Sequence, residues 1–235
     1  ISYHWWPRFK MGRISHLANI PVKAELSQAA AFIDTLAGVN WVTDLEGLIL
    51  AIGEANWTQF ARSAHGQHLV PDRLIGTSLF DQIQGEGVKI FYRDLHARLV
   101  SSKSESIEFN YRCDAPDIEC HMSMRITGIR GDGEVVGLLY QSGVTAQRPR
   151  PAIRIFEQVG SHTGPFLKIC SGCHDVVWPP DMTGPEREWI DLPEYYRRGG
   201  PEQVMLDHDI CPDCVAMVQT VSLTEIAVAE ENAGG

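Results

Sequence analysis

Residues 106–144 read SIEFNYRCDAPDIECHMSMRITGIRGDGEVVGLLYQSGV, and this stretch decides the fold. Apolar and polar residues alternate in three runs, at 106–113, 119–130 and 135–144, which is the pattern of half-buried strands. Between the second and third runs, Gly131-Asp132-Gly133 supplies residues that adopt positive φ in a hairpin turn. The stretch therefore predicts three consecutive antiparallel strands.

Upstream of these strands, the period of the apolar residues switches between that of a helix and that of a strand. The predicted elements are an amphipathic helix over residues 25–37, two short strands at 39–44 and 48–52, a one-sided helix around Trp57, and a long helix at 86–100. Two strands, a group of helices and three antiparallel strands predict an α+β fold, in which helices cover one face of an antiparallel sheet.

This order of elements resembles a PAS domain. The resemblance is carried by the strand pair Trp41–Gly53, the helix beginning Ala55-Asn56-Trp57, the segment Leu74-Ile75-Gly76-Thr77-Ser78-Leu79, the long helix and the closing strands. The run Tyr111-Arg112-Cys113-Asp114-Ala115-Pro116-Asp117 is similar to the R-C-D-S-P signature of a group of small bacterial PAS proteins. The resemblance implies a sensory or signalling function and a pocket between the sheet and the long helix.

The overall composition is that of an ordinary globular protein with an acidic balance. The chain has 20 basic and 30 acidic residues, a net charge of −10, and this disfavours binding to phosphate backbones. No apolar stretch approaches the roughly 18 residues that a membrane span needs. We predict no nucleic-acid partner, no membrane span and a cytoplasmic location. Ile1 is not a start methionine, so a leader removed before it would not be visible in this sequence.

Four of the six cysteines form two Cys-x-x-Cys pairs. Each pair places two thiolates on one tight turn, and two such turns together give the closed tetrahedral geometry of structural zinc. Thiolate ligands favour zinc or iron–sulfur clusters over hard cations. We therefore predict a metal site, with zinc preferred, at Cys170, Cys173, Cys211 and Cys214. The long segment between the pairs is expected to form a small structure of its own.

This half of the chain also resembles a cysteine module found at the end of many bacterial sensor proteins. The matching runs are Ile169-Cys170-Ser171-Gly172-Cys173, Glu188-Trp189-Ile190 with Glu194-Tyr195, and His208-Asp209-Ile210-Cys211-Pro212-Asp213-Cys214. Gly172, His174 and Asp209 depart from the module's pattern, but no thiolate is missing. His208 and His174 are the two histidines that either replace a cysteine ligand or hydrogen-bond to a ligand residue.

Two other interpretations of the cysteines remain open at this stage. Cys170-Ser171-Gly172-Cys173-His174 is also a C-x-x-C-H motif for covalent haem c, with Met182 as a conceivable second axial ligand. That interpretation leaves the second cysteine pair unexplained and requires export. A thiol–disulfide redox pair is the third interpretation, although the usual βαβ context is missing.

The expected PAS pocket is rich in aromatic residues, and its predicted lining is Phe91, Leu95, Phe109, Tyr111, Leu138 and Tyr140. Haem b in this pocket would require a histidine, and His96 is the candidate. Because His96 lies at the edge of the apolar stripe on the long helix, we expect a half-exposed side chain and no haem. The pocket is then either filled by its own rings or occupied by a small molecule.

No catalytic constellation is found in the sequence. There is no Ser–His–Asp order, phosphate-binding loop or H-E-x-x-H helix, and Gly85 and Gly87 are interpreted as turn glycines. Arg112 and Asp114 are interpreted as a charge pair fixing a corner that Pro116 stiffens, with ligand binding as the alternative. We predict that the protein is not an enzyme, with thiol redox activity as the alternative.

The predicted organisation is a basic and aromatic N-terminal arm (1–24), a PAS domain (25–147), a linker (148–164), a four-cysteine zinc-type module (165–217) and an acidic tail (218–235). The arm is either a docking segment or a solvated tail. The predicted function is signalling through protein contacts with an unknown partner. A homodimer is expected through the apolar stripe of the helix at 25–37, which includes Ile33. The alternative function is a haem-based redox or gas sensor.

Overall fold

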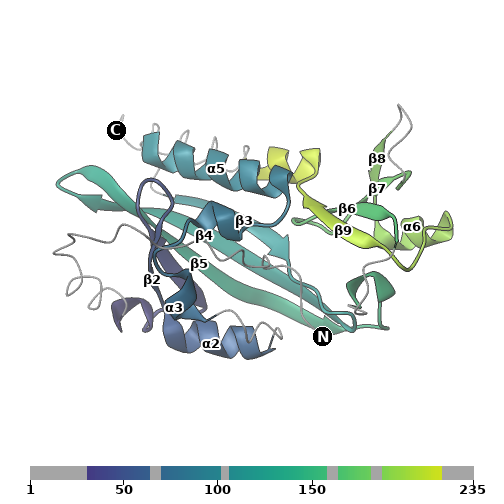
Figure 1. The fold of residues 1–235 in the computed structure, drawn as a ribbon, viewed down its shortest axis with the longest axis horizontal. Helices are drawn as coiled ribbons and strands as arrows, with labels where there is room; N and C mark the ends of the chain where they lie inside the picture. Colours follow the sequence, from purple (N-terminus) through teal and green to yellow (C-terminus); the bar gives the residue numbers. More distant parts are fainter. Residues whose placement is uncertain (1–30, 64–69, 102–105, 158–163, 181–186, 219–235) are drawn as a thin grey trace, which may run out of the picture.

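The computed structural model describes residues 31–63, 70–101, 106–157, 164–180 and 187–218 (Figure 1). The first half contains β1 Val39–Thr43, β2 Ile49–Ile52, α2 Glu54–Ser63, α3 Pro71–Leu74, α4 Leu79–Gln82, α5 Glu86–Ser101, β3 Ser106–Arg112, β4 Ile118–Gly131 and β5 Glu134–Pro149. The second half contains a short 3-10 helix Arg154–Phe156, β6 Phe166–Cys170, β7 Val176–Trp178, β8 Glu188–Ile190, α6 Leu192–Arg197 and β9 Met205–Asp209. Residues 212–218 are also helical.

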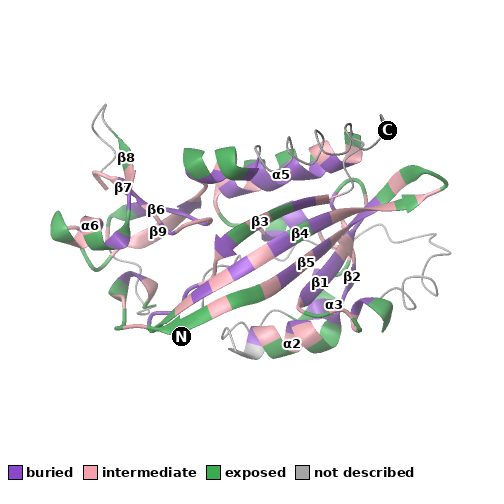
Figure 2. Cartoon of the chain, turned by 180° about the vertical axis from the view of Figure 1, so that it is seen from behind, coloured by how far each residue is buried: buried purple, intermediate pink, exposed green. Residues whose placement is uncertain are grey.

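The first half is built around a five-stranded antiparallel sheet in the order β2-β1-β5-β4-β3. Trp41, Tyr140, Ile126 and Ile107 are paired across four neighbouring strands, and all four are buried. Burial alternates along β3 and β4, so one face of the sheet is covered (Figure 2). The buried side of α5 faces the sheet, and the expected α+β, PAS-like arrangement is confirmed.

The hairpin between β4 and β5 forms where the glycines predict it. Asp132 and Gly133 have φ of 52° and 90°, and Gly131 pairs with Glu134. The strands on either side are long, and β5 continues to Pro149, which pairs with Ile118. The strand therefore extends beyond Val144, where the third alternating run of the sequence ends. Pairing with β1 stops at Ser142, so the remainder of β5 is an edge strand, where proline is tolerated.

The helix predicted at 25–37 lies mostly outside the described residues, as do the N-terminal arm and residues 219–235. Within the described part, residues 31–33 are helical, and the following turn packs on α2. The Ala55 N–H donates to Asp34 Oδ1 over 3.0 Å, and Asn56 Nδ2 donates to the Leu36 carbonyl over 2.7 Å. Ile33 is only 3% exposed within its own chain. It is therefore not an available dimer contact, which corrects that part of the prediction.

The second half has a four-stranded sheet in the order β8-β7-β6-β9, in which β6 and β9 are parallel. It has an apolar core formed by Ile155, Leu167, Ile169, Val176, Ile190, Leu192 and Tyr195. The segment between the cysteine pairs is thus a small structure, as expected. Among the described residues, no helix is long and apolar enough to cross a membrane.

Candidate metal centre and pocket

The two cysteine pairs meet because they follow two parallel neighbouring strands. β6 ends at Cys170, and β9 ends at Asp209, two residues before Cys211. Cys170 and Asp209 are register partners, and the Ser171 N–H donates to the Asp209 carbonyl over 2.8 Å. Since parallel strands run in the same direction, both cysteine pairs emerge at one edge of the sheet. We call residues 170–173 the first knuckle and residues 211–214 the second knuckle.

The four sulfur atoms form a cluster that fits a tetrahedral ion. The Sγ atoms of Cys170, Cys173, Cys211 and Cys214 all lie within 4.8 Å of one another. The Cys173 and Cys211 Sγ atoms are 3.8 Å apart. Zinc–sulfur bonds of about 2.3 Å imply about 3.8 Å between the sulfurs of a regular tetrahedron. The donor set is therefore suited to a closed metal site.

Backbone N–H groups surround the sulfurs. Cys170 Sγ accepts from the N–H groups of Gly172 and Cys211 over 3.3 and 3.2 Å. Cys173 Sγ accepts from the Asp175 N–H over 3.5 Å, and Cys211 Sγ from the Cys214 N–H over 3.4 Å. Such donors stabilise the thiolate form, which is the form that binds a metal.

The protonation of the thiols is strongly interdependent. Hydrogen bonds with the Cys173 and Cys214 thiols hold the pKa of Cys170 well below its usual range, while the same contact with Cys170 raises the pKa of Cys173. One thiolate thus forms readily, and its charge opposes ionisation of its neighbours. A bound dication would remove this conflict, because it is coordinated by deprotonated sulfur.

Gly172 departs from the resembled module because the sulfur cluster leaves no room for a side chain. A Cβ atom at this position would lie 2.6 Å from Cys214 Sγ. The first knuckle therefore needs glycine to approach the second one so closely.

Neither candidate histidine belongs to the metal-capable cluster found among the described residues. His174 has φ of 70° and is buried, with its ring 5.2 Å from that of Phe156 and Nδ1 3.4 Å from Asp114 Oδ2. The imidazole that haem c would need is thus packed between Asp114 and Phe156. Met182 lies outside the described residues. His208 Nδ1 lies 3.3 Å from Ser171 Oγ, within the first knuckle.

Asp114 is the polar centre of the contact between the two halves. Its fully buried carboxylate accepts from Arg112 Nε and Nη2 over 2.9 and 2.5 Å, and from Arg150 Nη1 over 2.6 Å. It also accepts from the Cys120 N–H over 3.0 Å. Burial alone would raise the pKa of Asp114, but the neighbouring His174 imidazole and the hydrogen bonds from Arg112 hold it well below its usual range.

The predicted Arg112–Asp114 pair is thus present, but its other partners are not evident in the sequence. Sequence reasoning assigns Arg150 to the linker and relates His174 only to the cysteine site or to haem. The one available signal is the position of Arg150 a few residues after the third alternating run. The groups that accept hydrogen bonds from the Arg150 side chain lie 34 to 36 residues away in sequence.

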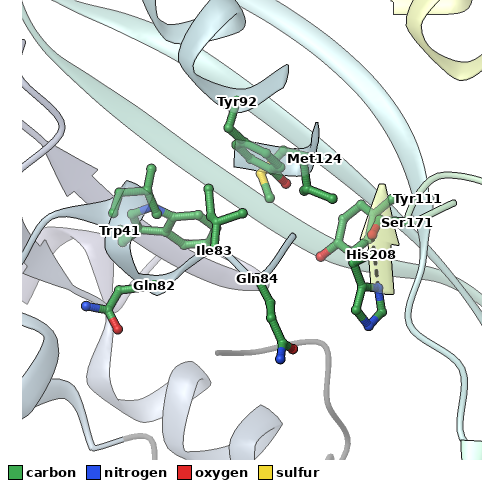
Figure 3. A pocket seen from close by; sticks show the side chains of 11 residues that line it. Trp41, Gln82, Ile83, Gln84, Tyr92, Tyr111, Met124, Ser171 and His208 are labelled. Atoms are coloured by element: carbon green, nitrogen blue, oxygen red, sulfur yellow. Dashed lines mark hydrogen bonds between the residues drawn. The ribbon is translucent and has the colours of Figure 1, made fainter. Parts of the chain in front are cut away.

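Two adjoining hollows lie where the first half of the chain meets the cysteine module (Figure 3). The open space, which includes solvent at the mouth, is about 530 Å³ for the larger hollow and about 310 Å³ for the smaller one. The larger is lined by Trp41, Leu79, Gln82, Ile83, Gln84, Val88, Tyr92, Tyr111, Met124, Ser171 and His208. The smaller also involves Phe91, Phe109, Gly172, Ile210, Cys214 and Val218.

The predicted pocket residues divide between lining and core. Phe91, Phe109 and Tyr111 line these hollows, whereas Leu95, Leu138, Tyr140 and His96 do not. His96 is 5% exposed, not half-exposed as expected. Its Nδ1 pairs with Tyr140 Oη at 2.9 Å and its Nε2 with the Leu45 carbonyl at 2.8 Å. Both ring nitrogens are occupied, so ligation of haem would require breaking a buried hydrogen bond.

No known protein-family model matches this chain, and no curated protein matches it. Among solved structures, the PAS domain of BvgS from Bordetella pertussis is similar at 15% identity and a TM-score of 0.39, over 53% of this chain and 88% of that chain. The PAS-B domain of Cycle from Drosophila melanogaster is similar at 12% identity and a TM-score of 0.34, over 45% of this chain and 98% of that chain. A sensory box sensor histidine kinase from Vibrio cholerae is similar at 8% identity and a TM-score of 0.35, over 53% and 93%. At these scores the likenesses carry no argument, and the fold class rests on the strand order, register and burial described above.

Proposed function

We propose that this chain is a sensory protein in which a PAS domain binds a small molecule and a structural zinc ion holds the four-cysteine module against it. The observation that carries the proposal is the convergence of four sulfurs within 4.8 Å at the contact between the two halves. When bound, zinc would supply structural cross-linking of Cys170, Cys173, Cys211 and Cys214.

The surroundings of the cluster favour a structural ion over a catalytic one. Cys170, Cys211 and Cys214 are buried, and four protein ligands leave no coordination position for a substrate. The proposal therefore assigns no catalytic step to the chain. Signalling would pass through protein contacts, and the bacterial origin, cytoplasmic location, partner and domain boundaries stay predictions.

The first prediction concerns metal content. We expect the purified chain to contain about one zinc per molecule by elemental analysis, with no visible absorption band. Cys211→Ser and Cys214→Ser should each lose most of the zinc, because three thiolates and a hydroxyl bind zinc more weakly. Cys120→Ser is the matched control, since Cys120 is a buried cysteine outside the cluster.

Three results would contradict this assignment. They are a chain without stoichiometric metal, a Soret band, and zinc retained in both knuckle variants. If the chain were brown and contained iron, the site would be assigned to an iron–sulfur cluster instead of zinc.

A further inference from the structure

We propose that the larger hollow is a binding site for an uncharged, largely apolar small molecule, and that the metal module forms one wall of it. Metal binding and ligand binding are then coupled. The inference rests on the proposed structural metal, and it adds the ligand class and the link between the two sites.

The wall comes from the knuckles themselves. Ser171 lies between the ligands Cys170 and Cys173, and His208 lies on β9 just before the second knuckle. Both residues line the larger hollow, and Figure 3 shows the hydrogen bond between them on the side of the hollow away from Trp41. The smaller hollow is lined by Cys214 itself and shares Val88, Tyr92, Tyr111 and Ser171 with the larger one.

The module is seated closely on the PAS half at this wall. The Arg112 N–H donates to the Ser171 carbonyl over 3.4 Å. A Cβ atom at Gly85, just before α5, would lie 2.0 Å from the His208 carbonyl oxygen. Ile210, Val215 and Val218 pack with the core of the PAS half. The positions of Ser171 and His208 therefore depend on the folded knuckles.

The lining defines the chemistry of the ligand. Among the described residues, the lining contains no Lys, Arg, Asp or Glu, and a charged group would be buried there without an opposite charge. Trp41, Tyr92 and Tyr111 provide aromatic surfaces suited to a flat ring.

Coupling follows from the shared wall. Loss of the metal removes the bonds that join the two cysteine pairs, so these turns lose the arrangement that places Ser171 and His208. A ligand that contacts this wall binds the metal-loaded form better. By thermodynamic reciprocity, the ligand must raise metal affinity by the same factor by which the metal raises ligand affinity.

Indole and indole-3-carboxylate are suitable probes, because they share a ring and differ in charge. Titration calorimetry on the zinc-loaded full chain should show indole binding, with the carboxylate at least about tenfold weaker. Removal of zinc by a chelator should weaken indole binding about tenfold or more, and saturating indole should raise zinc affinity by the same factor. Hydrogen exchange in β4 and β5 shows whether the PAS half remains folded throughout.

Ser171→Val tests the wall without removing a metal ligand, and Ser123→Val is the matched control on another strand. We expect Ser171→Val to retain zinc and to lose most of the coupling, while Ser123→Val behaves as wild type. If Ser171→Val fails to fold, His208→Gln tests the same wall. Absence of indole binding to the zinc-loaded chain, or equal indole affinity with and without zinc, would overturn the inference and leave the structural zinc intact. A chain that holds no zinc would instead overturn the proposed function.

Discussion

At the scale of single residues, the Asp114 carboxylate contacts side chains from three separate segments of the chain. It joins Arg112 at the end of β3, Arg150 just beyond β5, and His174 directly after the first knuckle. Arg112 and Arg150 are both largely buried, with 17% and 14% of their side chains exposed. Among the described residues, Arg150 forms an ion pair with Asp114 alone, whereas Arg112 also lies 3.6 Å from the carboxylate of Glu119.

Asp114→Asn should destabilise the protein by about 3–5 kcal/mol at pH 7, because it removes the ion-pair partner of the largely buried Arg150 and the nearer of the two carboxylates at Arg112. The pKa of Asp114 is lowered in the folded protein, so its contribution is present above the unfolded pKa of about 4 and is lost only as the pH falls below that value. The difference between wild type and variant in urea unfolding should thus be unchanged between pH 7 and pH 8.

Asp117→Asn is the control for Asp114→Asn, since Asp117 is an exposed aspartate in the same loop. It should unfold at nearly the wild-type urea concentration. Equal stability of the two variants would show that the carboxylate of Asp114 does not hold the corner together.

Residue-scale prediction is successful where the chemistry is local. The spacing within each Cys-x-x-Cys pair indicates the thiol cluster, and the two-residue spacing of Arg112 and Asp114 indicates their pairing. It fails for His96, because a helical stripe gives the direction of a side chain but not its partners. Tyr140 and Leu45 are far from His96 in sequence, yet they are the hydrogen-bond partners of its buried ring.

At the scale of elements, the start of α5 and the end of β9 approach each other closely. The sequence pattern predicts that Gly85 and Gly87 are turn glycines. Gly85 does have φ of 85°, but Gly87 lies in the first turn of α5, so that prediction is wrong for Gly87. The structure gives a steric reason for both glycines. Cβ atoms there would lie 2.0 Å from the His208 carbonyl oxygen and 1.7 Å from Asp209 Oδ1. The second half therefore docks on the turn before α5 through backbone contact.

Gly85→Ala should open this contact, and Gly133→Ala separates the effect of space from that of backbone strain. Gly133 has a similar φ of 90°, but a Cβ atom added there would have nothing within 4 Å. Each variant should lose about 1–2 kcal/mol from the strained backbone. Only Gly85→Ala should also increase hydrogen exchange in β9 and weaken indole binding. Identical exchange in the two variants would contradict the close docking.

The strands and helices of the first half could be predicted from periodicity because each carries a clear stripe or alternation. The parallel pairing of β6 with β9 could not, because both strands are short and their pairing spans more than thirty residues of intervening chain. The extension of β5 to Pro149 is missed for a related reason. Whether proline ends a strand depends on which edge is paired, and this is a property of the sheet.

At the scale of the whole molecule, the second half has its own apolar core, but it also contributes side chains to the core of the first half. Ile210 lies directly before the second knuckle, and Val215 and Val218 lie in the helix at 212–218, yet all three pack with the core beneath the first sheet. In Figure 1 this helix, in yellow, lies beside the start of α5. The sequence predicts two separate domains, because the residues that form the contact are scattered over both halves and give no local pattern. The coupling between metal binding and ligand binding that we propose depends on that contact.

The remaining prediction concerns self-association through the helix expected at 25–37. Ile33 is buried in its own chain, whereas Phe32 is 65% exposed. If two copies pair through this helix, the exposed side must make the contact. Phe32→Glu should then convert a dimer into folded monomers in light scattering. Ile33→Glu should instead unfold the chain, because it buries an unpaired charge.

Phe166→Glu is the matched control for Phe32→Glu, since Phe166 is 62% exposed and lies in the cysteine module. It should remain dimeric, because the same loss of an exposed ring occurs away from the expected interface. A wild-type chain that is monomeric at high concentration would contradict the dimer itself. A Phe32→Glu chain that stays dimeric would place the interface elsewhere, and the aromatic ring at position 32 would then be an ordinary exposed side chain.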